Sequence, residues 1–191
     1  MVQRDPDPSP DHAAATPPSV APVGDDDHLL GLPDAPLTLI VYGSYPCHFT
    51  RAVLPVVRDV RERLGDELRY AYRHFPVPAL HPHAEAAAEA AEAADAQGMF
   101  WPMHDLLFAN QRQLEVPDLL RYTHLLGLDA HRLQRELVEH RYAARVVADV
   151  ASGRAAGVAG TPALFVNGVR YDGIHETDVL AEALLTTGGL A

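Results

Sequence analysis

The sequence has very little cysteine and no long apolar run. Cys47 is the one cysteine among 191 residues, so no internal disulfide can form, and a disulfide-stapled scaffold is excluded. No apolar stretch approaches the roughly 18 residues that span a bilayer, and we expect a chain that is not integral to a membrane. The first residues lack the cationic and apolar segments of a secretory signal, which predicts a cytoplasmic location.

Positive charge is also scarce. The chain carries 15 basic residues against 26 acidic ones, and its formal net charge is −11. All 15 basic residues are arginine, and lysine is absent. Because an acidic surface repels a phosphate backbone, nucleic acid is not an expected partner.

The length and the 48% hydrophobic content predict one domain with one sizeable core. Residues 1–27 are rich in proline, aspartate, alanine and serine and end in an acidic run. Such a composition cannot bury enough apolar area to become ordered, so we predict a disordered tail over 1–27 and a folded domain over 28–191.

The hydrophobic pattern predicts a strand, a helix and a second strand at the start of the domain. The run from Leu37 to Tyr42 is almost wholly apolar, which is typical of a strand buried on both faces. Apolar residues then recur at spacings of three and four from Cys47 to Leu64, the pattern of an amphipathic helix. Apolar and polar residues alternate over 68–73, which indicates a strand.

A helical insertion over about 77–157 separates this unit from the rest. Beyond it, two short strands flank Asn167-Gly168, a dipeptide that favours a tight hairpin turn, and a last helix covers about 177–185. The first helix of the insertion carries Glu85, Glu89 and Glu92 on one stripe and alanines on the others. Two interpretations stay open for it: a closely packed alanine face, or a solvated helix.

The strongest chemical signal is the cysteine at the junction between strand and helix. Unpaired N–H groups and the helix dipole at that position stabilise a thiolate, the form that attacks disulfides. The alternative is a buried, unreactive cysteine that acts as a small apolar side chain. The position directly after a buried strand favours the reactive role.

Several segments together carry a resemblance to a known family. They are the junction YGSYPCHFT over 42–50, the blocks RHFP at 73–76 and HPHAEAA at 81–87, the segment from Phe100-Trp101 to Asn110, and GTP at 160–162 with Asn167-Gly168. Over about residues 29–186 the chain resembles the DsbA-like thioredoxin family of bacteria, in particular thioredoxin-like domains that occur alone or attached to sodium/proton antiporters. The resemblance implies an α/β fold, a thioredoxin-like sheet with a helical insertion.

The resemblance also implies roles for individual residues. Cys47 matches the nucleophilic first cysteine of C-x-x-C, and Pro162 matches a cis proline that faces it and, with Thr161, binds substrate. The chain departs from the family at Thr50, which stands in place of the second cysteine. One helical turn from Cys47, its hydroxyl could donate to the thiolate or cap the backbone. His48 could lower the thiol pKa or relay a proton, or it could simply face solvent.

Three functions are compatible with this pattern. The leading hypothesis is a redox-active cysteine in a thiol-disulfide oxidoreductase with a monothiol mechanism, acting on protein or small-molecule disulfides with no cofactor and with glutathione or another external thiol as co-substrate. The first alternative is a degenerate thioredoxin-fold binding or adaptor protein. The second is a one-cysteine peroxidase or a glutathione transferase-like activity. No metal site is predicted, because His81 and His83 lack further ligands at a familiar spacing.

Overall fold

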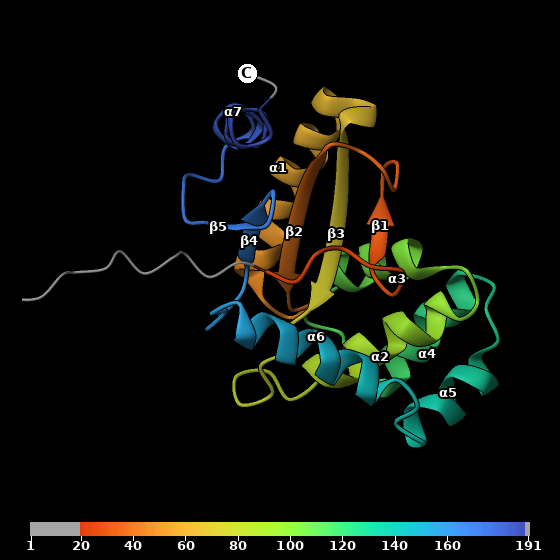
Figure 1. Cartoon of the computed structure of the whole chain (residues 1–191). Helices are drawn as coiled ribbons and strands as arrows, with labels where there is room; N and C mark the ends of the chain where they lie inside the picture. Colours follow the sequence, from red (N-terminus) through yellow and green to blue (C-terminus); the bar gives the residue numbers. More distant parts are fainter. Residues whose placement is uncertain (1–19, 190–191) are drawn as a thin grey trace, which may run out of the picture.

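The computed structural model describes residues 20–189. Its centre is a five-stranded sheet with the strand order β1-β3-β2-β4-β5 (Figure 1). The strands are β1 (His28–Leu30), β2 (Leu37–Gly43), β3 (Leu68–His74), β4 (Ala163–Val166) and β5 (Val169–Tyr171). Strands β2 and β3 are parallel, whereas the other neighbouring pairs are antiparallel. This is the mixed sheet of a thioredoxin-like fold.

Helices cover both faces of the sheet. Strand β2 is buried along its whole length, as its apolar sequence predicts. Its residues alternate between the two faces: Leu37, Leu39 and Val41 pack against α1 (His48–Leu64) and α7 (Thr177–Thr187), while Ile40 and Tyr42 belong to a second apolar cluster on the opposite face. Helix α6 (Ala143–Ala155) closes this second face, since its Gly153 lies against the rings of Tyr42 and Phe75.

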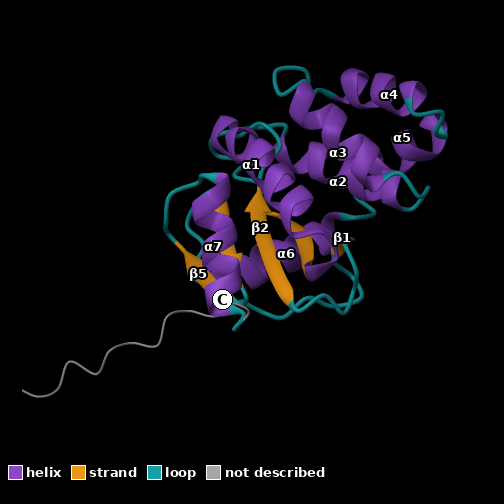
Figure 2. Cartoon of the chain, turned by 90° about the horizontal axis from the view of Figure 1, so that it is seen from above, coloured by secondary structure: helices purple, strands orange, loops and turns teal. Residues whose placement is uncertain are grey.

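The predicted insertion is present between β3 and β4. It contains α2 (Ala84–Asp95), α3 (Phe100–Ala109), α4 (Val116–Leu125), α5 (Ala130–Val138) and α6 (Ala143–Ala155). Helices α2 to α5 gather at one end of the sheet, away from α7 (Figure 2). Within residues 20–189 none of the helices combines the length and the hydropathy of a membrane span.

Helix α2 follows the first of the two interpretations of its sequence. Nine of its twelve residues are buried, and it packs against α3, α4, α5 and α6. The alanines let these helices approach closely. The stripe of carboxylates is divided: Glu85 is exposed, whereas Glu89 and Glu92 are buried. Both buried carboxylates bond to histidine, Glu89 to His140 and Glu92 to His28 and His74.

The N-terminal boundary needs a correction. Residues 20–27, assigned above to a disordered tail, lie along the sheet; residues 1–19 of that tail fall outside the described part. Arg73 on β3 donates to both carboxylate oxygens of Asp27, at 2.7 and 2.8 Å, and to the backbone carbonyls of Ala21 and Pro22. Val20 is buried, and its N–H donates to the carbonyl of Gly168. The order of this segment comes from a buried arginine far along the chain, which its own composition does not reveal.

Candidate active site

Cys47 lies between the end of strand β2 and the start of helix α1. It is the N-cap residue of α1, directly before His48, and it is 8% exposed. Its N–H donates to the carbonyl of Ser44 at 3.0 Å, and its own carbonyl accepts from the N–H of Arg51 at 3.1 Å. These two bonds hold the sulfur beside the free N–H groups of the first helical turn, as the strand-to-helix pattern predicted.

The start of β4 faces this sulfur. The peptide bond between Thr161 and Pro162 is cis, the isomer that the family resemblance implied. The Cys47 Sγ atom lies 3.3 Å from the backbone carbonyl oxygen of Thr161, to which the neutral thiol donates. Strand β4 pairs with β2 from Tyr42 to Leu39. The ladder between these two central strands therefore brings together residues that are 114 positions apart.

The surroundings of Cys47 favour its ionised form. Burial by itself would raise the pKa of the thiol, but hydrogen bonds from the side chains of Thr161 and Thr50 and from the backbone N–H groups of Thr50 and Phe49 outweigh it, so the pKa of Cys47 is lowered. The thiol bond to the Thr161 carbonyl acts in the other direction, because it is lost when the proton leaves. The side chains of Thr161 and Thr50, together with the backbone donors of the helix terminus, supply the net preference for the thiolate.

Thr50 is fully buried and occupies the position one turn after Cys47. Its Oγ1 atom accepts from the backbone N–H of Ser44 at 3.5 Å, and its hydroxyl is among the groups that lower the pKa of Cys47. The two roles considered for Thr50 are compatible, since one hydroxyl can accept from one group and donate to another.

His48 is placed differently from the other predicted site residues. It is exposed, and its imidazole lies over the ring of Phe49 with ring centroids 3.8 Å apart. Phe49 is itself 62% exposed. The structure therefore groups Cys47, Thr50, Thr161 and Pro162 and leaves His48 at the solvent-facing rim.

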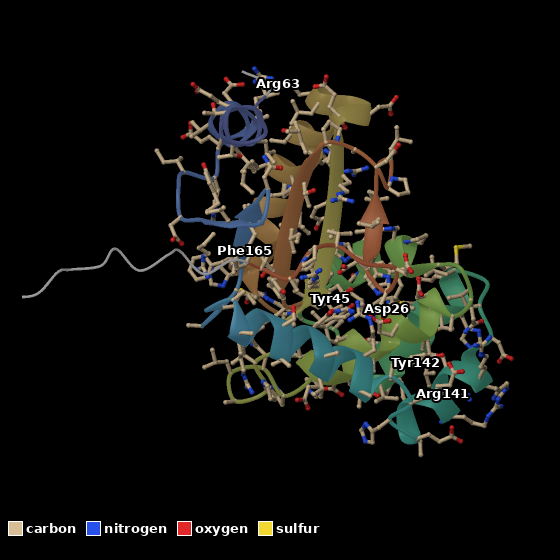
Figure 3. All side chains as sticks on the ribbon, in the orientation of Figure 1. Asp26, Tyr45, Arg63, Arg141, Tyr142 and Phe165 are labelled. Carbon is tan, nitrogen blue, oxygen red and sulfur yellow. The ribbon has the colours of Figure 1, made fainter. Side chains whose placement is uncertain are left out.

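Gln111 is a site residue that the sequence did not reveal. It follows α3, and its side-chain amide donates to the backbone carbonyls of Tyr45 and Cys47, the latter at 2.9 Å. Tyr45 is buried and lies where the sheet meets the insertion (Figure 3). The loop that presents the thiol is thus fastened to the helical insertion. A glutamine in a helix-ending loop gives no sequence signal for this role.

The described residues contain one group of three or more potential metal ligands whose donor atoms all lie within 4.8 Å of one another, and it consists of His28, His74 and Glu92. His81 and His83 are not part of it. These three residues belong to β1, β3 and α2, on the insertion side of the sheet.

A mixed sheet with a helical insertion, a thiol at the N-terminus of the first long helix and a cis proline opposite the sulfur define a DsbA-like thioredoxin fold. The thioredoxin family model matches residues 24–185, and the chain belongs to this family.

Relatives and solved structures agree with this assignment. The Na(+)/H(+) antiporter NhaA 3 of Salinispora tropica is 42% identical over 164 residues, which are 85% of this chain and 25% of the antiporter. The chain thus spans about a quarter of the length of the curated relatives that it matches. Oxidised BdbD from Bacillus subtilis superposes with a TM-score of 0.80 at 19% identity, covering 90% of this chain and 97% of BdbD.

A further solved structure with the same fold is the thiol-disulfide exchange protein alpha-DsbA2 from Wolbachia pipientis. Its TM-score is 0.70 at 16% identity, and the match covers 83% of this chain and 86% of alpha-DsbA2. At these identities the two superpositions establish the fold.

Proposed function

We propose that this protein is a thiol-disulfide oxidoreductase that works with one thiol, Cys47, and an external thiol such as glutathione. The observation that carries the proposal is the sulfur at the N-terminus of α1, with a lowered pKa and with the Thr161-Pro162 segment 3.3 Å away. The likeness to alpha-DsbA2, a thiol-disulfide exchange protein, supports the same class of reaction.

The reaction has two exchange steps. In the first, the Cys47 thiolate attacks one sulfur of a substrate disulfide, a new Cys47–substrate disulfide forms, and the other substrate sulfur leaves as a thiolate. In the second, the thiolate of the external thiol attacks the substrate sulfur of this mixed disulfide, and Cys47 leaves as a thiolate. The substrate ends as a mixed disulfide with the external thiol, and a second external thiol completes its reduction. Two external thiols are oxidised for each substrate disulfide reduced.

The residues around Cys47 have separate tasks in this scheme. The backbone of Thr161 and the ring of Pro162 line the sulfur and position the bound substrate segment. Thr50 stabilises the thiolate both as the attacking group and as the leaving group of the second step. Because Thr50 supplies no second sulfur, the mixed disulfide waits for the external thiol. A single cysteine is also compatible with a reducing compartment, and we place this exchange in the cytoplasm.

The proposal is tested with a peptide that carries a glutathione mixed disulfide. Glutathione, glutathione reductase and NADPH are supplied, and NADPH oxidation is followed with and without the protein. The natural protein is expected to accelerate the reaction with saturation in peptide, whereas Cys47→Ser should not exceed the uncatalysed rate. Mass spectrometry after acid quench should find Cys47 as a glutathione or peptide adduct. A natural protein that is no faster than Cys47→Ser would overturn the proposal.

Two observations favour a second function, a binding module without turnover. Cys47 is only 8% exposed, and Thr50 stands where the family has its second, resolving cysteine. In that case the surface near Pro162 holds a partner, and Cys47→Ser binds that partner as tightly as the natural protein does. The exchange function predicts instead that partner proteins are trapped covalently by the natural protein in cells and are absent from Cys47→Ser.

A further inference from the structure

Two histidines and one glutamate converge at the end of the sheet that faces the insertion. His28 Nε2 lies 2.8 Å from Glu92 Oε1, and His74 Nε2 lies 2.9 Å from the same oxygen. In the register of β1 and β3, His28 stands opposite Tyr72, two residues before His74, so both imidazoles are on the same face of the sheet. Glu92 reaches this face from α2.

The three side chains are buried and held in place. Their exposed fractions are 7% for His28, 1% for His74 and 6% for Glu92. The His28 ring is stacked on Phe100 with an interplanar angle of 8°, and the His74 ring meets the same Phe100 ring edge-on at 5.9 Å. The stacked ring and the shared carboxylate oxygen hold the three donor groups in one buried cluster.

We propose that His28, His74 and Glu92 bind a divalent transition metal ion of the zinc class. Two imidazole nitrogens and one carboxylate oxygen are a donor set that zinc accepts, whereas calcium requires six or more oxygens. Donor atoms on a tetrahedral zinc ion lie about 3.4 Å apart, as follows from metal–ligand distances of about 2.0–2.1 Å. All three donor atoms here lie within 4.8 Å of one another. Small side-chain rotations that move Glu92 away from the two nitrogens by about half an ångström make room for the ion.

The surroundings supply the other parts of a metal centre. The second ring nitrogen of His28, Nδ1, lies 3.6 Å from Asp95 Oδ1, and Asp95 is half exposed and able to close this gap. A carboxylate behind a ligating histidine fixes the tautomer of the ring and increases its basicity.

An acidic pocket of about 570 Å³ leads to the site. It is lined by His28 and Glu92 themselves, by the four aspartates Asp25, Asp26, Asp27 and Asp95, and by one basic residue, Arg145. Because the aspartates outnumber the arginine, the charge at the entrance attracts a cation, and the pocket leaves room for water as a fourth ligand. The N-terminal segment that Arg73 fastens to the sheet forms one wall of this pocket.

The proposal is independent of thiol exchange and is tested without it. Untagged protein carrying Cys47→Ser, which removes the competing thiol ligand, is titrated with zinc against a chromophoric chelator. We expect one zinc ion per chain. His28→Gln and His74→Gln should each weaken binding more than about 100-fold, and Asp95→Asn should weaken it about tenfold, the effect of losing a carboxylate behind the ligand. His140→Gln is the matched control.

The control is chosen because His140 Nδ1 also bonds to a buried carboxylate of α2, Glu89 at 3.0 Å, but has no second histidine beside it. Its loss should leave zinc affinity unchanged. X-ray absorption at the zinc edge and the visible bands of the cobalt protein give a readout that does not depend on variants folding. Two imidazoles with oxygen and no sulfur around the metal are expected. Absence of stoichiometric binding, or affinity that falls in His140→Gln or in His81→Gln as much as in His28→Gln, would overturn the proposal.

Discussion

Replacement of Thr50 by valine tests directly how the thiolate at Cys47 is stabilised. Valine keeps the shape of threonine in a fully buried position and removes the hydroxyl that lowers the pKa of Cys47. A hydrogen bond to a charged group contributes about 1.5–3 kcal/mol, and the lower figure corresponds to about a tenfold change in the ratio of thiolate to thiol. The pKa of Cys47 should therefore rise in Thr50→Val.

The consequence for the rate of alkylation has two parts. At a pH below the pKa of both proteins, about tenfold fewer molecules of the variant carry the thiolate, which slows the reaction about tenfold. A thiolate of higher pKa is intrinsically more nucleophilic, with a Brønsted coefficient of about 0.4–0.5, and this recovers about threefold. The net expectation is a rate about threefold lower at a pH below both pKa values and about threefold higher at a pH where both proteins are fully ionised. The two pH profiles therefore cross.

The assay is the rate of iodoacetamide modification across pH, followed by mass spectrometry. Thr123→Val is the matched control, because Thr123 is also fully buried and helical, and its hydroxyl donates to the carbonyl of Leu119. Its pH profile should coincide with that of the natural protein. If Thr50→Val coincides with it as well, the Thr50 hydroxyl does not stabilise the thiolate, and the Thr161 side chain and the backbone donors of the helix terminus act without it.

Three further substitutions test position 50, the N-terminal segment and the packing of α6. Thr50→Cys should form a disulfide with the thiol one turn away and depend less on glutathione, as non-reducing mass spectrometry and turnover will show. Asp27→Asn breaks a buried pair with Arg73 and should lower the free energy of unfolding in urea by about 3–5 kcal/mol. Gly153→Ala adds a methyl group 2.9–3.0 Å from two aromatic rings and should cost about 1 kcal/mol net, since overpacking exceeds the gain in helix propensity.

Each change has an internal check. Cys47→Ser combined with Thr50→Cys must show no disulfide. Burial alone would raise the pKa of Asp27, but its interaction with Arg73 outweighs burial and lowers the pKa below the ordinary value of 3.8. Its contribution is therefore complete above the unfolded value of 3.8 and is lost as the pH falls through the lower folded value, so natural protein and Asp27→Asn should converge in stability in acid. Gly24→Ala, with nothing within 4 Å of the added carbon, should be neutral. Equal losses in Gly24→Ala and Gly153→Ala would contradict the packing argument.

The fold could be predicted from local patterns because its central elements have strong ones. The apolar run of β2 and the three-to-four spacing of α1 each match the observed element to within a residue at each end. Asn167 takes a positive φ of 48°, as the hairpin turn requires. Short β1 carries no such pattern. Its three residues, His28–Leu30, form a strand because they pair with β3. Their own sequence does not predict this pairing.

The site residues also fall into those with a local sequence pattern and those without one. Cys47, Thr50 and Pro162 could be named from the sequence because they lie in motifs with a mechanism or a family match. Gln111 and the cluster of His28, His74 and Glu92 could not, since they act through contacts that close only in the folded chain. Glu92 is 64 residues from one histidine and 18 from the other. Sequence motifs for metal sites depend on ligands that lie close together in the sequence. The three proposed ligands come from β1, β3 and α2, so no such motif contains them.

Helix α2 gives alanine an unusual importance in this protein. On a surface helix one alanine can be exchanged for almost any residue, but seven alanines of α2 are buried between four other helices. Their methyl groups fix the thickness of the layer at the centre of the insertion. A scan of all substitutions should therefore find its least tolerant positions among the smallest side chains of the chain, since each added carbon there displaces a whole helix rather than a loop.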